Sequence, residues 1–202
     1  MKKIKILFFI ESLRASGKER RLSELLKGLK KHPNIEYQLV LTDKDVHYKE
    51  VFDLKIKIHY IIRKNVKKDP RLFFKFFKIA KLFRPDVIHV WGNMTSIYAI
   101  PTKIILGIPM INSQITNVTL IKSTRFTFLF SDIIVANSKA GLKAYNAPNY
   151  KSKYIYNGFD FNRIKKVSKK ENVRKKFSIH SKYIVCMISS FVENKDYVTY
   201  IE

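Results

Sequence analysis

The 202-residue sequence contains little cysteine, little glycine and few acidic residues. Its single cysteine, Cys186, has no partner within the chain, so a disulfide framework is excluded and a reducing cytoplasm is the natural compartment. No apolar run reaches the roughly 18 residues of a membrane span, because Pro101 and Lys103 interrupt the best candidate. The apolar run that ends at Ile10 is also too short for a secretion signal. We therefore expect a cytoplasmic protein whose membrane contact, if any, is peripheral and at the inner face of the cell membrane.

The scarcity of acidic residues leaves a large positive charge. Sixteen Asp and Glu stand against 40 Lys and Arg, which gives a formal net charge of +24. Nucleic acid, an anionic membrane surface and a phosphorylated small molecule all fit such a field. The alternative is that a nucleotide-composition bias of the genome, which favours Lys, Ile, Asn, Phe and Tyr, accounts for part of the charge without any partner. No nucleic-acid reading module is found, so no specific nucleic acid is expected. A basic Rossmann-like domain that binds nucleic acid or anionic membranes without catalysis stays open as the alternative function.

Short apolar runs alternate with helix-period segments along most of the chain. Because the apolar runs are continuous, they predict parallel strands that are covered on both faces. The sequence therefore predicts an α/β fold with a doubly wound, Rossmann-like parallel sheet. The predicted strands are 4–10, 37–41, 56–62, 87–91, 108–111, 133–136 and 154–156, and the predicted helices are 19–31, 71–83, 95–106, 118–130 and 139–145.

Polar residues follow several predicted strands, where a doubly wound sheet binds its ligand. They include Gly17 after the first strand, Trp91 and Asn93 after 87–91, Ser138 after 133–136 and Asn157 after 154–156. Their amide and hydroxyl groups suit a sugar-like ligand. The small-residue turn at Gly17 brings backbone N–H groups close to a phosphate or sugar oxygen. A tight turn that only lets the helix pack on the sheet is the other interpretation.

The composition changes after Asp160. Residues 163–176 carry eight basic side chains and one acidic one, which is typical of a solvated linker or an exposed helix. The run KYIVCMISSF then predicts a buried strand, followed by the start of a helix. We expect a first domain over 1–166, a basic linker over 167–181 and one βα unit over 182–202. One βα unit leaves its strand unpaired, so further sequence is expected beyond it.

The segment RLFFKFFKIAKLF, residues 71–83, predicts a basic amphipathic helix. Lys75, Lys78 and Lys81 recur at helical spacing among phenylalanines. Such a helix is able to lie on an anionic bilayer. A helix that covers the sheet and carries a charged outer stripe is the alternative.

Five stretches together resemble one known family. SGKERRLSEL, RPDVIHVWGN, SDIIVANSKAGLKAY, YIYNGFD and ISSFVENKDY, in this order and spacing, resemble the N-terminal half of family 4-like glycosyltransferases of the two-domain GT-B type. The resemblance implies a nucleotide-sugar donor, a polysaccharide or lipid-linked acceptor, and a hexosyltransferase that retains the anomeric configuration. It implies neither a metal ion nor another cofactor, because basic side chains and helix N-termini stabilise the leaving diphosphate.

The resemblance also implies roles for individual residues. It assigns the donor phosphates to Gly17 and Lys195, and contact with the sugar or acceptor to Trp91, Asn93 and Ser138. A solvated surface charge is the other interpretation of Lys195, and for Trp91 it is filling of the core.

The sequence departs from the family pattern in three places. Relatives often carry Arg where this chain has Ser190, and a second histidine where it has Trp91. His89 is expected to be structural. The paired glutamates of the family's donor domain have no counterpart, so we expect little or no transfer and weak or no binding of nucleoside diphosphates by this chain alone. A second polypeptide that supplies the donor domain and an interrupted gene are the open explanations.

Overall fold

The computed structural model describes residues 2–64, 69–113, 121–161, 173–189 and 196–201. The chain divides into two compact units, Met1–Phe159 and Asp160–Glu202, which are described separately below. The predicted domain boundary at residue 166 lies outside the described residues.

The N-terminal unit is built on a seven-stranded sheet in the order β3-β2-β1-β4-β5-β6-β7. Each adjacent pair of strands is parallel. The predicted doubly wound parallel sheet is therefore confirmed. The strands are β1 Ile4–Ile10, β2 Ile35–Leu41, β3 Ile58–Tyr60, β4 Val87–Trp91, β5 Met110–Ser113, β6 Ile133–Ala136 and β7 Ser152–Tyr154.

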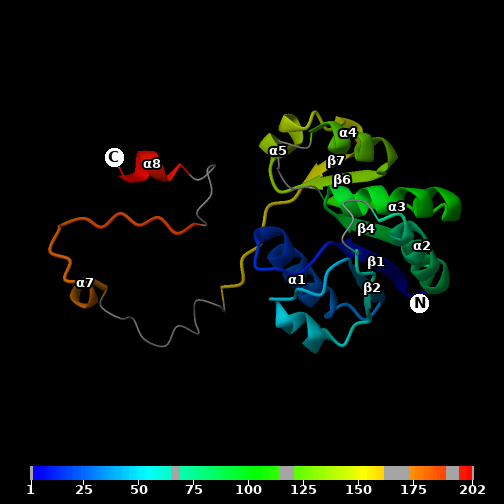
Figure 1. Cartoon of the computed structure of the whole chain (residues 1–202), viewed down its shortest axis with the longest axis horizontal. Helices are drawn as coiled ribbons and strands as arrows, with labels where there is room; N and C mark the ends of the chain where they lie inside the picture. The colour runs from blue at the N-terminus through cyan, green and yellow to red at the C-terminus, as the bar shows by residue number, and fades with distance from the viewer. Residues whose placement is uncertain (1, 65–68, 114–120, 162–172, 190–195, 202) are drawn as a thin grey trace. The chain divides into compact units, whose positions relative to one another are not determined.

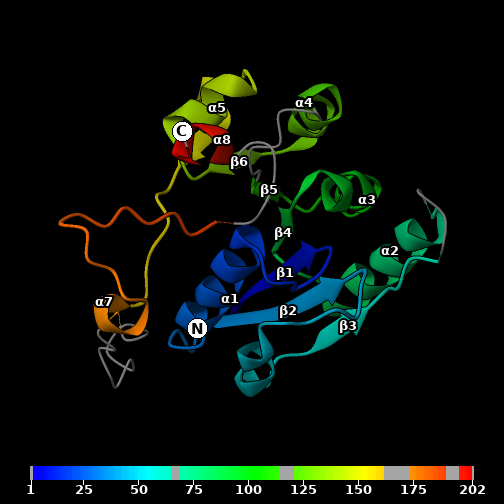
Figure 2. The same cartoon turned by 60° about the vertical axis from the view of Figure 1, so that its left-hand side comes forward.

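Helices cover both faces of this sheet. Figures 1 and 2 show α1 on one face and α2 and α3 on the other. Each face has its own apolar core: Leu22 and Leu26 of α1 pack on one side, and Leu72 and Phe76 of α2 on the other. The helical elements of this unit are α1 Gly17–Leu29, η1 Lys49–Leu54, α2 Arg71–Phe83, α3 Asn93–Leu106, α4 Ile121–Phe130, α5 Lys139–Ala144 and η3 Asn149–Lys151.

Strand β1 shows why its sequence is continuously apolar. Leu7 and Phe9 join the core under α2 and α3, whereas Phe8 and Ile10 join the core under α1. Successive side chains point to opposite faces, so a strand covered on both faces needs an apolar residue at every position. The ring of Phe9 stacks on Phe76 of α2 with a centroid separation of 4.5 Å.

Helix α2 has the bounds that the sequence predicted. Its start is fixed by Asp69, whose carboxylate accepts hydrogen bonds from the backbone N–H of Arg71 at 3.2 Å and from its guanidinium at 2.8 and 2.6 Å. Side-chain hydrogen bonding by Arg71 holds the pKa of Asp69 well below its usual range. The helix ends at Arg84, which adopts the left-handed conformation with φ 53°.

The last strand was predicted two residues too late. Strand β7 is Ser152–Tyr154, not 154–156, because Ser152 pairs with Ile134 and Tyr154 with Ala136 of β6. Tyr154 and Tyr156 are exposed and their rings pack on each other instead of on the core. The β-propensity of the aromatic run misplaced the strand. An edge strand tolerates the polar residues Ser152 and Lys153 that the apolar criterion rejected.

The unit Asp160–Glu202 contains the short helices α7 Val173–Lys176 and α8 Tyr197–Ile201 among its described residues. The buried strand predicted from KYIVCMISSF is wrong for its described part: residues 183–189 form no strand and are mostly exposed, including Cys186. Apolar composition alone does not make a strand, because the backbone needs a neighbouring strand to pair with.

Candidate functional site

The carboxyl ends of all the parallel strands lie at one edge of the sheet, which we call the carboxyl edge. The loops after β1, β4, β6 and β7 reach this edge within the described residues. The structure therefore places Gly17, Trp91, Asn93, Ser138 and Asn157 on the same side of the N-terminal unit.

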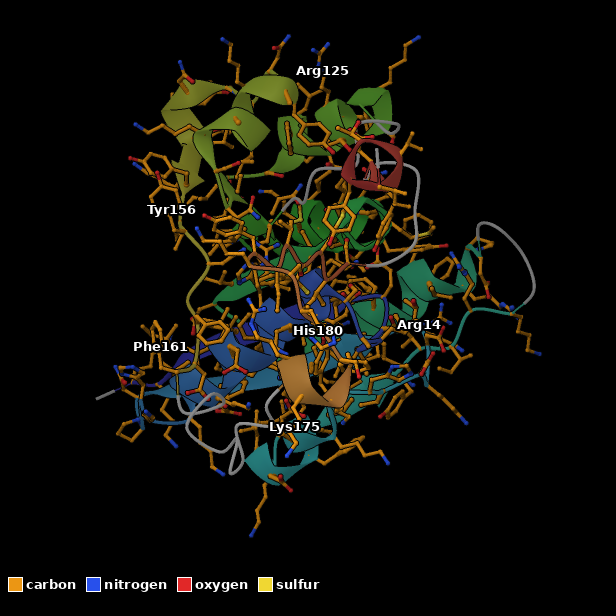
Figure 3. All side chains as sticks on the ribbon, turned by 90° about the vertical axis from the view of Figure 1, so that its left-hand side faces the viewer. Arg14, Arg125, Tyr156, Phe161, Lys175 and His180 are labelled. Atoms are coloured by element: carbon orange, nitrogen blue, oxygen red, sulfur yellow. The ribbon has the colours of Figure 1, made fainter. Side chains whose placement is uncertain are left out.

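The loop between β1 and α1 is fixed by contacts with the segment that follows β2. Arg14 pairs with Asp43 at 2.9 Å and with Asp45 at 2.8 Å. The hydroxyl of Tyr48 donates to the carbonyl oxygen of Ser16 at 3.0 Å. These contacts fix the position at which α1 begins. Arg14, and Tyr156 from the segment after β7, are labelled in Figure 3.

Gly17 is the first residue of α1, and its surroundings are open. A Cβ atom added at Gly17 would meet no heavy atom within 4 Å, and Gly17 does not have a positive φ. The hydroxyl of Ser16, the N-cap, contacts the Glu19 carboxylate and does not cap a backbone N–H. The packing of the described residues therefore does not require a glycine here, and the contact of Gly17 with the donor phosphates stays a prediction.

Charged side chains surround the first turn of α1. Lys18 forms ion pairs with Glu11, at the end of β1, and with the buried Glu19. The Glu11 carboxylate also packs against Gly92, the residue after β4. Gly92 has φ +121°, and a Cβ added there would lie 2.7 Å from Glu11 Oε1. The ends of β1 and β4 are thus joined through a glycine that another residue would disturb.

Trp91 lies mostly in the core. It is 6% exposed and packs in the apolar cluster under α1, so it fills core space. Its indole Nε1–H has no hydrogen-bond partner among the residues that the structure describes. A buried donor without a partner is uncommon in proteins. Because this N–H is itself buried, it does not reach a ligand in this structure, and a contact between Trp91 and a sugar stays a prediction.

Asn93 is the first residue of α3, and one of the two polar atoms of its side-chain amide has a hydrogen-bond partner. Its Nδ2 donates to Ser123 Oγ at 2.9 Å, which ties α3 to α4. Its buried Oδ1 has no partner within the described part of the chain. The contact of Asn93 with a sugar or acceptor stays a prediction.

Ser138 is the N-cap of α5. Its hydroxyl oxygen accepts a hydrogen bond from the backbone N–H of Gly141 at 3.0 Å. This bond explains why a serine is found there without any ligand. Its predicted contact with a sugar or acceptor stays a prediction.

His89 has the structural role that was expected. Its Nε2 lies 2.8 Å from Ser113 Oγ of β5, and its ring packs between Phe8 and Trp91, 5.2 Å from each. Burial lowers the pKa of His89 to about 3. A neutral imidazole held in this way links β4 to β5 and carries no charge at neutral pH.

Arg21 is the residue that the sequence analysis missed. Its guanidinium lies over the Trp91 ring, 5.6 Å from the centroid, and donates to Asn157 Oδ1 at 3.1 Å. Burial lowers the pKa of Arg21 and the charge of Glu19 raises it, but an arginine stays cationic at neutral pH. Arg21 therefore joins α1, β4 and the segment after β7. The one feature of the sequence that points to Arg21 is its position about one helical turn after Gly17.

The structure gives no information on two residues that the family resemblance singled out. Lys195 and Ser190 lie outside the described residues. In the described ranges, no group of three or more His, Cys, Asp or Glu side chains is placed to hold a metal ion.

The sequence and the fold were then compared with those of known proteins. The family described as Glycosyltransferase Family 4 matches residues 15–163. No curated protein matches the sequence.

Several solved structures share the fold of the N-terminal unit. HepE (Alr3699) of Anabaena in complex with UDP and glucose has a TM-score of 0.65 and 19% identity, and the match covers 79% of this chain and 46% of HepE. MurG of Acinetobacter baumannii has a TM-score of 0.59 and 12% identity, with 78% and 46% covered. UDP-GlcNAc 2-epimerase of Neisseria meningitidis bound to UDP-GlcNAc has a TM-score of 0.56 and 17% identity, with 76% and 47% covered. The match thus spans about half the length of each of these proteins.

Proposed function

The chain belongs to glycosyltransferase family 4, and from that premise we propose that its carboxyl edge forms one wall of a sugar-transfer site. The reaction would move a sugar from a nucleotide-sugar donor to a hydroxyl group of a polysaccharide or lipid-linked acceptor, with retention at the anomeric carbon. The opposite wall would be a second Rossmann-like domain, on the same polypeptide or on another one.

The open N-terminus of α1 is the observation that carries this proposal. In the described structure the backbone N–H groups of Gly17, Lys18 and Glu19 have no acceptor. The dipole of this 13-residue helix gives the same end a partial positive charge. A diphosphate bound there would meet several donors without losing a protein hydrogen bond.

The chemistry of transfer suits these groups. The leaving nucleoside diphosphate gains negative charge as the bond to the sugar breaks, and oriented N–H donors stabilise that charge in the transition state. The cations Lys18 and Arg21 lie near the same turn. Asn93 Oδ1 and Trp91 Nε1–H are buried in this structure, so they would orient hydroxyl groups of the sugar or acceptor only after a local rearrangement exposes them. Lys195 would add a cation from the donor side.

The structure of HepE with UDP and glucose supports uridine nucleotides as the first ligands to test. The experiment is an NMR titration of the whole chain with UDP at up to millimolar concentration. We expect weak binding with shifts of the amide signals of residues 17–21 and 91–93. Shifts that leave these two segments unchanged would contradict the proposed site.

A pair of glycine variants sharpens this test. Gly17 and Gly28 both belong to α1, and a Cβ at either would meet no atom within 4 Å. Gly17→Val and Gly28→Val therefore carry similar folding costs, but only Gly17→Val obstructs the helix N-terminus. We expect UDP binding to be lost in Gly17→Val and kept in Gly28→Val. Equal binding by both variants would remove Gly17 from the site.

Peripheral association with anionic membranes is a second proposed property of the same unit. Its support is the outer surface of α2, where Phe74 and Leu82 are each 77% exposed. Lys75 and Lys81 lie beside them and are also exposed. Exposed apolar and cationic side chains on one helix are the combination that binds a charged bilayer surface. In the parts of the chain that the structure describes, no helix is long and apolar enough to cross a bilayer.

Co-sedimentation with vesicles tests this second property. We expect the protein to bind phosphatidylglycerol vesicles at low salt, to dissociate as salt is raised, and not to bind pure phosphatidylcholine. The double variant Phe74→Ser/Leu82→Ser should lose binding, while Ile188→Ser, at an exposed apolar residue of the other unit, should keep it. Unchanged binding by the double variant would show that α2 is not the membrane surface.

A further inference from the structure

One part of the sheet face under α2 has polar side chains where a core would have apolar ones. The connection from β2 to β3 crosses on the α1 side, where Tyr48 and Val51 enter the α1 core. On the opposite face, Gln38 of β2 and His59 of β3 lie in an open groove beside α2. His59 Nε2 is 2.7 Å from Gln38 Oε1. The local sequence thus fits a wet surface and not a helix-covered one.

The groove has a volume of about 610 Å³ and collects four lysines from two elements and a loop. Lys5 comes from β1, Lys57 from the residue before β3, and Lys75 and Lys78 from α2. We call these four residues the lysine groove. Glu36 is the single carboxylate in its lining, so the local charge is strongly positive.

The four lysines are not neutralised by acidic partners. In the described structure none of their ammonium nitrogens lies within 4.0 Å of a carboxylate oxygen, although the backbone N–H of Lys5 donates to Asp86 Oδ2 at 2.8 Å. By contrast, Lys18, Lys27 and Lys103 elsewhere in this unit all form ion pairs. Lys5 Nζ is 3.5 Å from the carbonyl oxygen of Phe83 and lies over the Phe83 ring. Four like charges gathered in a concave site, with one carboxylate as counter-charge, focus a positive potential that attracts an anion.

The residues that line the groove indicate which kind of anion it would bind. The α2 residues of the groove all lie beyond the first turn of the helix, where backbone N–H groups are bonded within the helix and none is free. Ammonium groups must therefore supply the binding. Ile79, Leu82 and Phe83 form an apolar border next to the lysines. A compact, multiply charged group such as a phosphate, with or without an apolar tail, fits this combination.

We propose that the lysine groove binds the phosphate group of an anionic ligand through Lys5, Lys57, Lys75 and Lys78. The groove includes residues from the amino ends of β1 and β2, whereas the proposed transfer site lies at the carboxyl ends of the strands. The proposal is therefore independent of the proposed transfer site, whereas it shares Lys75 and Leu82 with the proposed membrane surface of α2. The phosphate belongs either to the headgroup of an acidic phospholipid or to a soluble phosphate compound.

The test is an NMR titration of the whole chain with two probes. Inorganic pyrophosphate represents the soluble source, and short-chain phosphatidylglycerol below its critical micelle concentration represents the lipid source. We expect shifts at the backbone amides of Gln38, Lys57 and His59. Tighter binding of the lipid probe assigns the groove to a headgroup, and tighter binding of pyrophosphate assigns it to a soluble ligand.

Two variants with the same net charge distinguish binding in the groove from nonspecific attraction of anions to a cationic protein. Lys57→Gln/Lys78→Gln removes two groove charges, and Lys31→Gln/Lys49→Gln removes two exposed charges outside it. The groove variant should bind at least about tenfold more weakly, while the control stays within about twofold of the parent. Equal weakening in both variants, no binding of either probe, or shifts confined to residues 17–21 would overturn the proposal.

Discussion

Two apolar segments of the chain have similar composition and opposite environments. Strand β1 is paired on both sides, by β2 and β4, and its residues from Leu7 to Ile10 are buried. Residues 183–188, YIVCMI, are just as apolar, yet Tyr183 is 76% and Ile188 94% exposed. The difference lies in the neighbours: β1 has strands at both edges and helices on both faces. Burial is a property of the partners that a segment finds, and only secondarily of its own residues.

The largest expected effect is the loss of stability when Phe9 of β1 is truncated, measured against truncation of Ile188 in the exposed segment. Phe9→Ala removes a fully buried ring that stacks on Phe76, and should lower the free energy of unfolding by about 3–5 kcal/mol. Ile188→Ala should change it by less than about 0.5 kcal/mol, because the side chain is exposed. Urea denaturation is followed by tryptophan fluorescence, which reports the unit that contains Trp91, and by far-UV circular dichroism, which reports both units. Similar losses in both variants would mean that the 183–188 segment is buried after all.

A smaller effect is expected from the glycine that joins β1 to β4. Gly92→Ala places a Cβ against the Glu11 carboxylate in a backbone conformation unsuited to alanine, and should cost about 1–3 kcal/mol of stability. Gly17→Ala serves as the matched control, because its Cβ meets no atom within 4 Å and its φ is not positive. It should leave stability unchanged or slightly raised. If both substitutions had the same effect, the close packing of Glu11 on Gly92 would be wrong.

The pH dependence of stability gives a third test of the N-terminal unit. Arg71 lowers the pKa of Asp69 in the folded state, so this carboxylate stabilises the fold above its unfolded pKa of about 3.9. That contribution is lost as the pH falls below this value, because the unfolded chain then binds the proton more readily. Asp69→Asn should lower stability at pH 7 and flatten its decline in acid.

Asp53→Asn, at an exposed carboxylate, controls for the change in net charge. Thermal unfolding between pH 2 and 7 provides the measurement for all three proteins. An acid decline as steep in Asp69→Asn as in the parent would contradict the role of the Asp69–Arg71 pair.

The smallest expected effect concerns the thiol of Cys186. Because this residue is exposed in the native chain, a thiol reagent should modify it at nearly the same rate with and without denaturant, within about twofold. A buried strand at 183–189 would protect it, and labelling would then accelerate greatly on unfolding.

The sequence predicted those features that local residues control. The bounds of β1, β4, β6 and α2 follow from continuous apolar runs and from helical spacing, and they match the structure. The position of β7 did not follow, because its pairing with β6 decides it and its own residues are polar. The strand predicted at 183–189 was wrong for the converse reason, since its residues are apolar but pair with no strand among the described residues.

The candidate site likewise has features that the sequence predicted and features that only the folded chain reveals. The rule that ligands bind at the carboxyl ends of strands selected Gly17, Trp91 and Asn93 from the sequence. It did not reveal that Trp91 is mostly buried, or that Arg21 bridges Trp91 and Asn157. Those contacts join residues up to 136 positions apart, and only the folded chain brings them together.

The most direct test of the account is amide hydrogen exchange of the whole chain with and without saturating UDP. The proposed site predicts slower exchange in the first turn of α1 and around residues 91–93, and no change in residues 183–189. Protection in 183–189 that leaves the start of α1 unaffected would contradict the claim that the carboxyl edge of this sheet holds the donor.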